Sequence, residues 1–414
     1  LQTRSGVTEY RPLHVIPLDT AEETEENDSL DTAQPMELNR AYCGRMLEKD
    51  RDFYSLQVDK PMILTVELLG MRLGNTVPDS VVTLRDPAGK VLASSTGHPF
   101  SVNDPMLQVQ VADPGRYFIE VRELLGAGSE QSHYVLCAGD YPRPVACYPP
   151  GGPVGQEFEI ECRGDLGGDY KHSVRTPPHA SRDYSYAPPR NGQRPPTPIP
   201  FRLSPHPNLL EKEPNNSLAE STRGERTHAF CGVISETDDE DWFEFAAVEG
   251  ESIDIEVYAR RVRSSLDPSI AVFDADGTLV ASNDDGGKVT DHSDAEERGV
   301  DCFLRFKPQA TASYYIRIND VLHTGSPTHV YRIECTPTAP WMLIRLPRVQ
   351  DPNELYGQYR QQIFVARGNR FAALARARTR DFSGRLKLEF PQLPEGVSYE
   401  TQNIPAGTTG FPIV

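Results

Sequence analysis

The sequence is short of positive charge, of long apolar runs and of helical periodicity. It holds 42 Lys and Arg against 60 Asp and Glu, a formal net charge of −18. Because affinity for nucleic acid comes from basic side chains that neutralise phosphates, this balance excludes a nucleic-acid-binding protein. No apolar run approaches the 18 or more residues that a membrane-spanning helix needs. The 36 Pro among 414 residues favour loops and strands over helices.

Signatures of catalysis and of redox chemistry are also missing. The sequence has no H-E-x-x-H, no G-x-S-x-G, no G-x-x-x-x-G-K-[ST] and no dinucleotide-binding glycine run. It has no C-x-x-C, so zinc ribbons, c-type haem attachment and thioredoxin chemistry lack their usual residues. Composition alone leaves a glycosidase carboxylate pair open. Paired acids in a duplicated β domain are nevertheless more typical of structure or calcium binding, so we predict that this chain is not an enzyme.

An internal repeat organises the chain. The run Glu23 to Leu30 returns 188 residues later as Glu211 to Leu218, and the same offset carries Cys43-Gly44 onto Cys231-Gly232. Further along, the offset becomes 197, and Tyr117 falls on Tyr314. Two copies of one domain therefore follow each other. The predicted boundaries are 1–17 for the end of a preceding segment, 18–142 for copy 1, 143–205 for a spacer, 206–339 for copy 2 and 340–414 for a truncated further module.

Apolar residues alternate along both copies, as in half-buried antiparallel strands. Residues 53–58 and 253–258 show this pattern, and residues 84–92 and 272–280 are typical of hairpins. We predict an all-β fold of tandem, jelly-roll-like β-sandwiches with eight or nine strands each. The Pro-rich spacer fits a small immunoglobulin-like module with a strand at 158–162 and a surface loop over 176–200. Strands at 342–346, 362–365 and 386–390 would open the last module.

Both ends of the sequence look cut. Leu1 is not an initiator Met, residues 1–6 carry no apolar signal-peptide core, and residues 411–414 end in an apolar run without a closing turn. We therefore expect a processed or excerpted piece of a longer chain.

Acidic residues gather at corresponding places in the two copies. Calcium takes six to eight oxygen ligands, and a turn-rich acidic segment can supply several of them. In an extended segment, Glu211, Glu213 and Asn215 alternate onto one side, with Asn216 at the following bend. Asp238 and Asp241 could complete the shell. The alternative is a set of solvated acids in which Asn215 makes an Asx-type turn. A second group at Asp267, Asn283–Asp285 and Asp320 is more typical of loop solvation or capping.

The constellation of Glu211-x-Glu213-Pro214-Asn215-Asn216-Ser217, Cys231-Gly232, Asp239-Glu240-Asp241-Trp242-Phe243 and Tyr314-Tyr315-Ile316 resembles the bacterial pre-peptidase C-terminal domain. This family of secreted, non-catalytic β-sandwiches includes the collagen-binding domains of clostridial collagenases. The resemblance covers most of copy 2 and, more weakly, copy 1. The order of sandwich, spacer and sandwich is similar to that of large surface proteins of planctomycete-type bacteria.

The resemblance implies one Ca²⁺ in each copy. In copy 2 the resemblance places the ligands at Glu211, Glu213, Asn215, Asn216, Asp238 and Asp241. The residues of copy 1 that match these ligands position by position are Glu23, Glu25, Asn27, Asp28 and Asp52. The loop in copy 1 is one residue shorter, so Asp50 matches Asp238 only approximately.

The seven cysteines suggest three disulfides. Cys43 and Cys137 lie near the first and last strands of copy 1, and Cys231 and Cys335 lie at similar places in copy 2. The simplest pairing is Cys43–Cys137, Cys231–Cys335 and, in the spacer, Cys147–Cys162. In this pairing Cys302 has no partner. Such bonds would fit an oxidising compartment. The alternative is a set of buried free thiols.

These features predict a secreted or cell-surface protein whose calcium-stabilised repeats serve adhesion, matrix assembly or a fibre. Its partner would be an extracellular protein or polysaccharide, or further copies of itself. The runner-up is the accessory region of a secreted peptidase whose catalytic domain lies elsewhere. A third hypothesis is a carbohydrate- or collagen-binding module. Its aromatic anchors would be Tyr184, Tyr186, Tyr258 and one of the neighbours Tyr314 and Tyr315.

Overall fold

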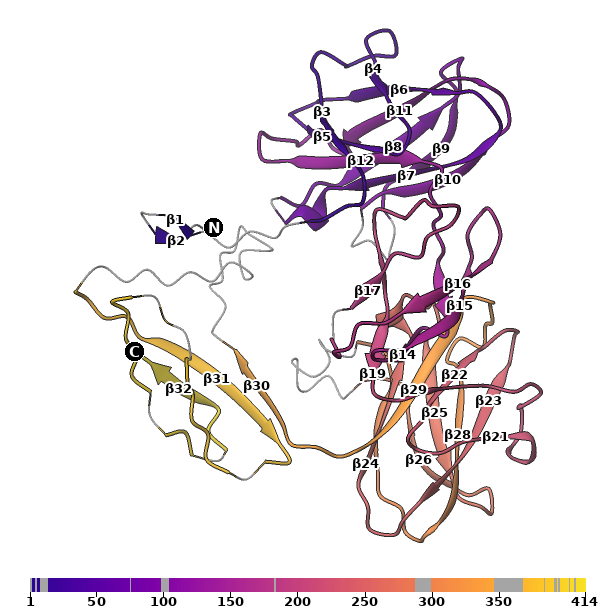
Figure 1. The fold of residues 1–414 in the computed structure, drawn as a ribbon, viewed down its shortest axis with the longest axis vertical. Coiled ribbons are helices and arrows are strands. Elements are labelled where there is room, and N and C mark those ends of the chain that lie inside the picture. Colours follow the sequence, from indigo (N-terminus) through magenta and orange to yellow (C-terminus); the bar gives the residue numbers. More distant parts are fainter. Residues whose placement is uncertain are drawn as a thin grey trace. The chain divides into compact units, whose positions relative to one another are not determined.

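The computed structural model describes residues 2–3, 6–7, 14–74, 76–97, 104–181, 184–286, 299–345 and 368–414, apart from 383, 391–392, 394, 402 and 406. Strands dominate these ranges (Figure 1), which confirms the all-β class. The helical elements described are the single 3-10 turns η1 (Met71–Leu73), η3 (Leu218–Glu220) and η4 (Arg260–Val262). No described helix has the length and apolarity to cross a membrane. The chain divides into two compact units, residues 14–337 and residues 1–13 with 338–414.

Copy 1 is built from two five-stranded sheets. The first has the order β10 (Met106–Val111), β7 (Met62–Leu69), β12 (His133–Gly139), β5 (Arg40–Arg45) and β3 (Thr20–Glu22). The second has the order β4 (Gln34–Met36), β6 (Asp52–Val58), β11 (Gly115–Glu123), β8 (Ser80–Arg85) and β9 (Val91–Ser95). Ten described strands therefore replace the eight or nine expected. The short strand β3 pairs in parallel with β5, and β4 pairs in parallel with β6. Alternation alone does not reveal strands of this length.

Copy 2 repeats this order strand for strand. Its first sheet is β20 (Asn208–Leu210), β22 (Ala229–Val233), β29 (Val330–Pro337), β24 (Ile253–Tyr258) and β27 (Phe303–Phe306). Its second sheet is β21 (Thr222–Arg223), β23 (Glu240–Ala247), β28 (Ala312–Asp320), β25 (Pro268–Phe273) and β26 (Leu279–Asn283). Each copy thus has the same topology, as the sequence repeat predicts.

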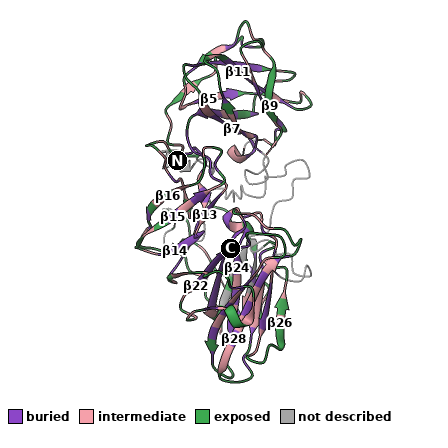
Figure 2. Ribbon diagram, turned by 90° about the vertical axis from the view of Figure 1, so that its right-hand side faces the viewer, coloured by how far each residue is buried: buried purple, intermediate pink, exposed green. Residues whose placement is uncertain are grey.

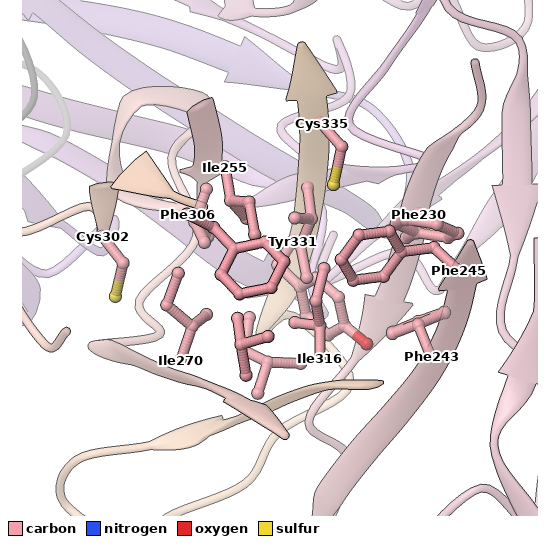
Figure 3. Close-up of a cluster of buried hydrophobic side chains, with 14 of the residues drawn as sticks. Phe230, Phe243, Phe245, Ile255, Ile270, Cys302, Phe306, Ile316, Tyr331 and Cys335 are labelled. Carbon is pink, nitrogen blue, oxygen red and sulfur yellow. The ribbon is translucent and has the colours of Figure 1, made fainter. Parts of the chain in front are cut away.

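A hydrophobic core lies between the two sheets of each copy. In copy 2, Phe243 and Phe245 of one sheet pack in the same cluster as Ile255 and Tyr331 of the other (Figure 3). Alternation explains this arrangement, because every second residue of a strand faces the same side. Along β23, buried residues alternate with more exposed ones (Figure 2). Figure 3 also shows that β23 and β29 supply side chains to one interior.

The predicted hairpin turns are confirmed. Strand β8 turns into β9 and β25 turns into β26, each with antiparallel register. The turns close with hydrogen bonds from Gly89 N to Asp86 O (2.8 Å) and from Gly277 N to Asp274 O (3.1 Å). Both glycines have positive φ, 83° and 78°, a conformation that glycine adopts without a steric penalty.

The spacer has its own small core. Its strands are β13 (Ala146–Tyr148), β15 (Glu157–Arg163) and β16 (Tyr170–Arg175) in one sheet, and the pairs β14 (Gly151–Pro153) with β19 (Arg202–Ser204) and β17 (Ser185–Tyr186) with β18 (Ile199–Pro200). Ile160 and Phe201 lie in the core. The expected surface loop is thus partly ordered as β17 and β18, and Tyr184 and Tyr186 pack against the core.

The other unit contains β1 (Gln2–Thr3) with β2 (Gly6–Val7), and a sheet of β30 (Trp341–Arg345), β31 (Ala373–Arg380) and β32 (Gly410–Ile413). The strand expected at 342–346 is confirmed, one residue earlier. The strand expected at 362–365 lies outside the described residues. Residues 386–390 do not form the expected strand, because only Leu386 pairs, in an isolated bridge with Ile404.

A buried ion network joins the spacer to copy 2. Arg332 of β29 is fully buried, and its guanidinium donates to Glu334 Oε1 (2.8 Å) and to Ser204 Oγ (2.9 Å). Arg202 of the spacer donates to Glu334 Oε2 at 2.7 Å. Although burial opposes ionisation, the guanidiniums of Arg332 and Arg202 lower the pKa of Glu334 to about 2. The carboxylate therefore stays charged between two fixed cations.

All seven cysteines lie in the described residues and are free thiols, so the three predicted disulfides are wrong. In copy 2, Cys335 lies in the core with Phe230 (Figure 3). Cys231 follows Phe230 on β22 and therefore faces the other side of the sheet, opposite Arg332. A bond between Cys231 and Cys335 would have to pass through the sheet.

The two copies also do not place their last cysteines alike. Tyr134 pairs with Gly44 as Tyr331 pairs with Gly232, so the offset on these strands is 197. At this offset Cys137 matches Glu334, and Cys335 matches Ala138. A slip of one residue along a strand turns a side chain to the opposite face. The apparent recurrence of the cysteine pair was therefore misleading.

The spacer cysteines are placed as expected but are not bonded. Cys147 and Cys162 are direct cross-strand partners on β13 and β15. The odd Cys302 lies in the core of copy 2 (Figure 3).

Candidate metal centres

The candidate ligands lie on a segment that crosses from one sheet to the other. In copy 2 this segment, residues 211–221, leaves β20 in the first sheet and enters β21 in the second. In copy 1, residues 23–33 make the same crossing from β3 to β4. Side chains on the crossing segment therefore lie at the edge where both sheets of a copy meet, within reach of residues from each.

In copy 2, Glu211, Glu213 and Asp241 each offer a carboxylate oxygen, and the three oxygens lie within 4.8 Å of one another. Asp241 occupies the first inward position of β23, ahead of the core residues Phe243 and Phe245, and it is fully buried. A carboxylate thus stands where alternation calls for an apolar side chain. A buried carboxylate needs a proton, hydrogen bonds or a cation.

Asn215 is fully buried beside these acids. One terminal atom of its amide lies 3.1 Å from Glu213 Oε2 and 3.0 Å from Asp241 Oδ1. If that atom is nitrogen, Asn215 donates two hydrogen bonds to the carboxylates. If it is oxygen, the amide and the two carboxylates turn oxygens toward one another, which is the arrangement around a bound cation. The assignment of such an amide depends on what its surroundings hold.

Neighbouring strands hold the acids of copy 2 in place. The backbone N–H of Val233 donates to both oxygens of Glu211, at 3.0 and 3.1 Å. Tyr331 Oη donates to Asp241 Oδ2 at 2.7 Å and lies 3.3 Å from Glu211 Oε2. Gly232 leaves room for this contact, because a Cβ there would lie 2.0 Å from Glu211 Oε2 and 2.1 Å from Tyr331 Oη.

Copy 1 assembles the same site. Glu23, Glu25 and Asp52 bring carboxylate oxygens within 4.8 Å of one another. Tyr134 Oη lies 2.6 Å from Glu23 Oε1 and 2.8 Å from Asp52 Oδ2, so its hydroxyl can donate to either acid, and Tyr331 stands between the corresponding acids in copy 2. Asn27 is fully buried, and its Oδ1 has no hydrogen-bond donor among the described residues; the same holds for Asp52 Oδ1. Two buried oxygens at the site are therefore available to a cation.

The pKa values reflect the crowding of these acids. Burial, and then the charge of Glu211, raises the pKa of Asp241 far above its usual range. Burial also raises the pKa of Glu211, despite its hydrogen bonds from Val233 N and Tyr331. In copy 1, burial and then Glu23 raise the pKa of Asp52. A buried aspartate and a half-buried glutamate this close together resist ionising at the same time, so each site favours either protons or a positive ion.

The remaining predicted ligands lie at the rim of the site or outside it. Asn216 is exposed. Asp238 is exposed and pairs with His323, with 3.1 Å between Asp238 Oδ1 and His323 Nδ1. Asp28 and Asp50 lie next to each other at the rim of the copy 1 site, where partial desolvation and Asp50 raise the pKa of Asp28. Asp28 and Asp50 thus form an acidic pair at the rim of the copy 1 site. Asp238 is not part of the cluster of Glu211, Glu213 and Asp241 in copy 2.

Asp239 is the structural counterpart of Asp50. Leu47 N donates to Asp50 Oδ2 at 3.1 Å, and Ser235 N donates to Asp239 Oδ2 at 2.7 Å. The residue before each aspartate, Lys49 or Asp238, has a φ near 60°. Asp239 also contributes to the raised pKa of Asp241. The extra residue in the loop of copy 2 shifts the equivalence by one position.

Sequence reasoning missed the tyrosines and glycines that hold the acids. Tyr134 and Tyr331 are related by the offset of 197, and Gly44 and Gly232 by the offset of 188. Their recurrence at repeat positions was the available signal. Gly44 has the same role as Gly232, because a Cβ there would lie 2.6 Å from Tyr134 Oη and 2.7 Å from Glu23 Oε2.

The other candidate sites do not assemble. Among the described residues, clusters of three or more acidic, His or Cys ligand atoms occur only at the two sites above, so the group around Asp267 is not one of them. Of the proposed aromatic anchors, Tyr314 is in the core. Tyr258 is buried beneath Arg202 and Arg261, with guanidinium-to-ring distances of 4.3 and 4.1 Å.

Comparison with known proteins gives structural likenesses only. No family model matches the chain, and no curated protein matches it. The pre-peptidase C-terminal domain of a Bacillus anthracis collagenase is similar over 26% of this chain and 93% of its own, with 16% identity and a TM-score of 0.22. Aeromonas hydrophila PliG, a periplasmic inhibitor of g-type lysozyme, is similar over 29% of this chain and 96% of its own, with 15% identity and a TM-score of 0.21.

Tandem CBM51 modules of a family 98 glycoside hydrolase from Streptococcus pneumoniae SP3-BS71 are similar over 73% of this chain and 85% of their own. Their identity is 9% and the TM-score is 0.18. Likenesses at this level do not indicate what the chain binds.

Proposed function

We propose that each copy binds one calcium ion, and that the chain is a non-catalytic, extracellular array of modules that the ion stabilises. In copy 2 the ion would be held by Glu211, Glu213, Asn215 and Asp241. In copy 1 it would be held by their counterparts Glu23, Glu25, Asn27 and Asp52. The observation that supports this proposal is the recurrence of a buried amide among three carboxylates at the same place in two copies.

The donor set favours calcium over other cations. It consists of oxygens alone, with up to three negative charges, whereas zinc and copper sites use nitrogen and sulfur. Glu213 and Glu25 are exposed at the mouth of each site, so water could complete a shell of six to eight ligands. Magnesium demands a smaller and more regular octahedron. The ion's chemical contribution would be to neutralise acids that otherwise compete for protons.

Its structural effect would be to fasten the crossing segment to both sheets. Glu211 and Glu213 belong to the segment, whereas Asp241 belongs to β23 and is held by Tyr331 of β29. A cation among them links three parts of the copy that are far apart in the sequence. Within this proposal the copies are jelly-roll-like sandwiches, the spacer is immunoglobulin-like, and the array serves adhesion or fibre assembly on an extracellular protein, a polysaccharide or its own copies.

Isothermal titration of calcium-free protein with CaCl₂ tests the proposal. We expect two bound ions per chain, one after Asp52→Asn or Asp241→Asn alone, and none after both changes. Extracellular modules commonly bind Ca²⁺ with a Kd of about 10⁻⁴–10⁻³ M, so the titration should reach several millimolar. Matched controls are Asp59→Asn in copy 1 and Glu249→Gln in copy 2, both at exposed acids.

An unchanged heat signal in the double variant would locate the binding elsewhere. Absence of any calcium-dependent heat in the unmodified chain, together with an unchanged thermal midpoint, would overturn the proposal itself.

A further inference from the structure

The loop that follows the central strand of the second sheet begins with two exposed apolar residues in both copies. In copy 1, Leu124 and Leu125 follow β11, and Leu125 is 81% exposed. In copy 2, Val321 and Leu322 follow β28 at the offset of 197, and Leu322 is 67% exposed. Single exposed apolar residues are common, but a pair at the same loop of two copies is not explained by the packing of either copy.

Hydrogen bonds hold each pair in a fixed turn. In copy 1, Glu123 Oε2 accepts from the backbone N–H groups of Leu125 and Ala127, each at 2.7 Å. In copy 2, Asp320 Oδ2 accepts from the backbone N–H of Thr324 at 3.0 Å. The apolar residues are therefore displayed on an ordered turn, and a partner that binds them does not have to order the loop.

Basic residues flank the apolar pair of copy 1. The guanidinium of Arg122 donates to Leu124 O at 3.2 Å. The backbone N–H of Lys49 donates to Gly126 O at 3.0 Å, so the loop that carries this exposed lysine lies against the same turn. Arg51 Nη2 and Arg122 Nε lie 3.2 and 3.8 Å from one oxygen, Oε1 of Glu120.

A single buried carboxylate serves the arginines of this surface. Glu120 is shared by Arg51, Arg122 and Arg85, whose Nη2 lies 2.6 Å from Glu120 Oε2. The pair of Lys49 with Glu48 is exposed on both sides and therefore weak. This side of copy 1 thus carries a surplus of positive charge beside the apolar pair.

The corresponding surface of copy 2 has the opposite balance. The counterparts of Lys49, Arg51, Arg85, Arg122 and Glu120 are Asp238, Glu240, Phe273, Asn319 and Arg317. Four cations and one acid in copy 1 therefore correspond to two acids and one cation in copy 2. The one cation, Arg317, pairs with Glu240 at 3.2 Å. Asp238 lies 3.1 Å from His323 of the turn itself, which places this acid beside the apolar pair.

Acids at shared positions do not account for the difference. Asp50 and Asp79 of copy 1 have the acidic counterparts Asp239 and Asp267 in copy 2. The same backbone turn thus presents an apolar pair with a basic flank in copy 1 and an apolar pair with an acidic flank in copy 2. We refer to Leu124 and Leu125 with their basic flank as tip 1, and to Val321 and Leu322 with their acidic flank as tip 2.

We propose that tip 1 of one chain binds tip 2 of another copy of the chain. The apolar pairs would pack on each other, and the opposite charges beside them would set the orientation. Because the two tips are different surfaces, the contact is heterologous, and each chain can join two neighbours. An anionic membrane would suit tip 1 but would repel the acids of tip 2. The proposal rests on the part of the proposed function in which the chain binds its own copies, and it requires neither calcium site.

Analytical ultracentrifugation of the whole chain tests the contact. Two apolar side chains on each tip bury far less than the ~1,200 Å² of a standard interface, so the contact should be weak. The weight-average mass should rise steadily with concentration and reach about twice that of the monomer where the concentration equals Kd. Added NaCl should weaken the association, because exposed charges are screened.

Two variants distinguish a heterologous contact from a symmetric one. Leu125→Ser removes tip 1 and Leu322→Ser removes tip 2, and both side chains are too exposed to be needed for folding. Each variant alone should stay monomeric. An equimolar mixture should form dimers and no larger species, because one intact tip of each kind remains. Leu166→Ser, at an exposed leucine of the spacer, is the matched control and should associate like the unmodified chain.

A chain that stays monomeric at all concentrations would overturn the proposal, and so would a mixture of the two variants that stays monomeric. Dimers of Leu322→Ser alone would overturn it by showing that tip 1 binds itself. Binding to anionic vesicles that is lost in Leu125→Ser, without self-association, would assign tip 1 to a membrane instead. Calcium uptake by a monomeric chain would leave the calcium proposal intact, so the two proposals can fail separately.

Discussion

Tyr331 on β29 donates a 2.7 Å hydrogen bond to Asp241 on β23, and this bond connects the two sheets of copy 2. The tyrosine ring is part of the hydrophobic core, while its hydroxyl reaches the acidic site. The core and the candidate metal centre are therefore adjacent parts of one structure, and a change at either should affect the other.

Removing this hydroxyl should destabilise the protein without abolishing calcium binding. In Tyr331→Phe the buried Asp241 loses its donor, which costs about 1–3 kcal/mol. Because the tyrosine is not one of the proposed ligands, the calcium-dependent rise in the thermal midpoint should remain. Urea unfolding with and without CaCl₂ measures both effects. Tyr315→Phe, on the half-exposed face of β28, is the matched control. Loss of the calcium effect in Tyr331→Phe would make the hydroxyl a ligand.

A methyl group at Gly232 should abolish the calcium response of copy 2. Its Cβ would overlap Glu211 Oε2 and Tyr331 Oη, so both must move. We expect Gly232→Ala to bind one ion fewer by calorimetry and to melt several degrees lower. Gly410→Ala is the control, because its Cβ would meet nothing closer than 3.6 Å. Two ions in Gly232→Ala would show that Glu211 is dispensable.

Stability without calcium should fall as the pH rises. The unfolded acids titrate near pH 4, whereas the folded pKa is about 7 for Glu211 and about 10 for Asp241. Between these limits the folded state binds more protons than the unfolded state, so each such group costs about 1.4 kcal/mol per pH unit. Saturating calcium should remove this slope, because the ion takes the place of the protons. The check is a series of urea titrations from pH 4 to pH 9, and Asp241→Asn should flatten the calcium-free curve. A calcium-free curve that rises over this range would contradict the geometry.

Loss of the charge on Glu334 should be among the most damaging single changes in copy 2. The variant Glu334→Gln leaves Arg332 and Arg202 without their shared carboxylate, and removal of one partner from a buried ion pair costs about 3–5 kcal/mol. Equilibrium unfolding in urea measures the loss. The exposed pair of Lys387 and Glu389 provides the comparison, and Glu389→Gln should leave stability nearly unchanged. Similar results for the two variants would show that the network is not rigid.

Thiol titration should count seven free cysteines in unreduced protein unfolded in guanidinium chloride. In the native state Cys43 should react first, because it alone is not fully buried. Burial raises the pKa of Cys137 and Cys335, which slows their reaction. A count of five would indicate a disulfide, and mass spectrometry would then show whether it joins the facing pair Cys147 and Cys162.

Sequence alone predicted the features that depend on repetition and alternation. The repeat located both copies, and alternation placed the strands β6, β15 and β24. Asp241 was predicted from the short acidic cluster that it forms with Asp238 and from the family resemblance. Three acids and one amide in each copy were predicted as neighbours, and the structure brings them together.

The errors arose where one residue decides the geometry. An extra residue in the loop before β23 put Asp239, not Asp238, in the place of Asp50. Cys335 stands one residue beyond the repeat equivalent of Cys137, so Cys335 faces the core and Cys137 faces the other side of its sheet, which no count of cysteines reveals. Tyr331 and Tyr134 are far in sequence from the acids that they hold. Only the pairing of β29 with β22 brings them there.

The parallel pairing of β20 with β22 has a mechanical consequence. Tension on the chain that enters copy 2 would pull β20 along its neighbour, so that its backbone hydrogen bonds would be loaded together in shear. The acidic segment follows directly, and an ion there would anchor the same strand at its other end. Single-molecule pulling should therefore record a higher rupture force for each copy in calcium than in chelator. Equal rupture forces in calcium and in chelator would show that the ion does not help the copy to resist tension.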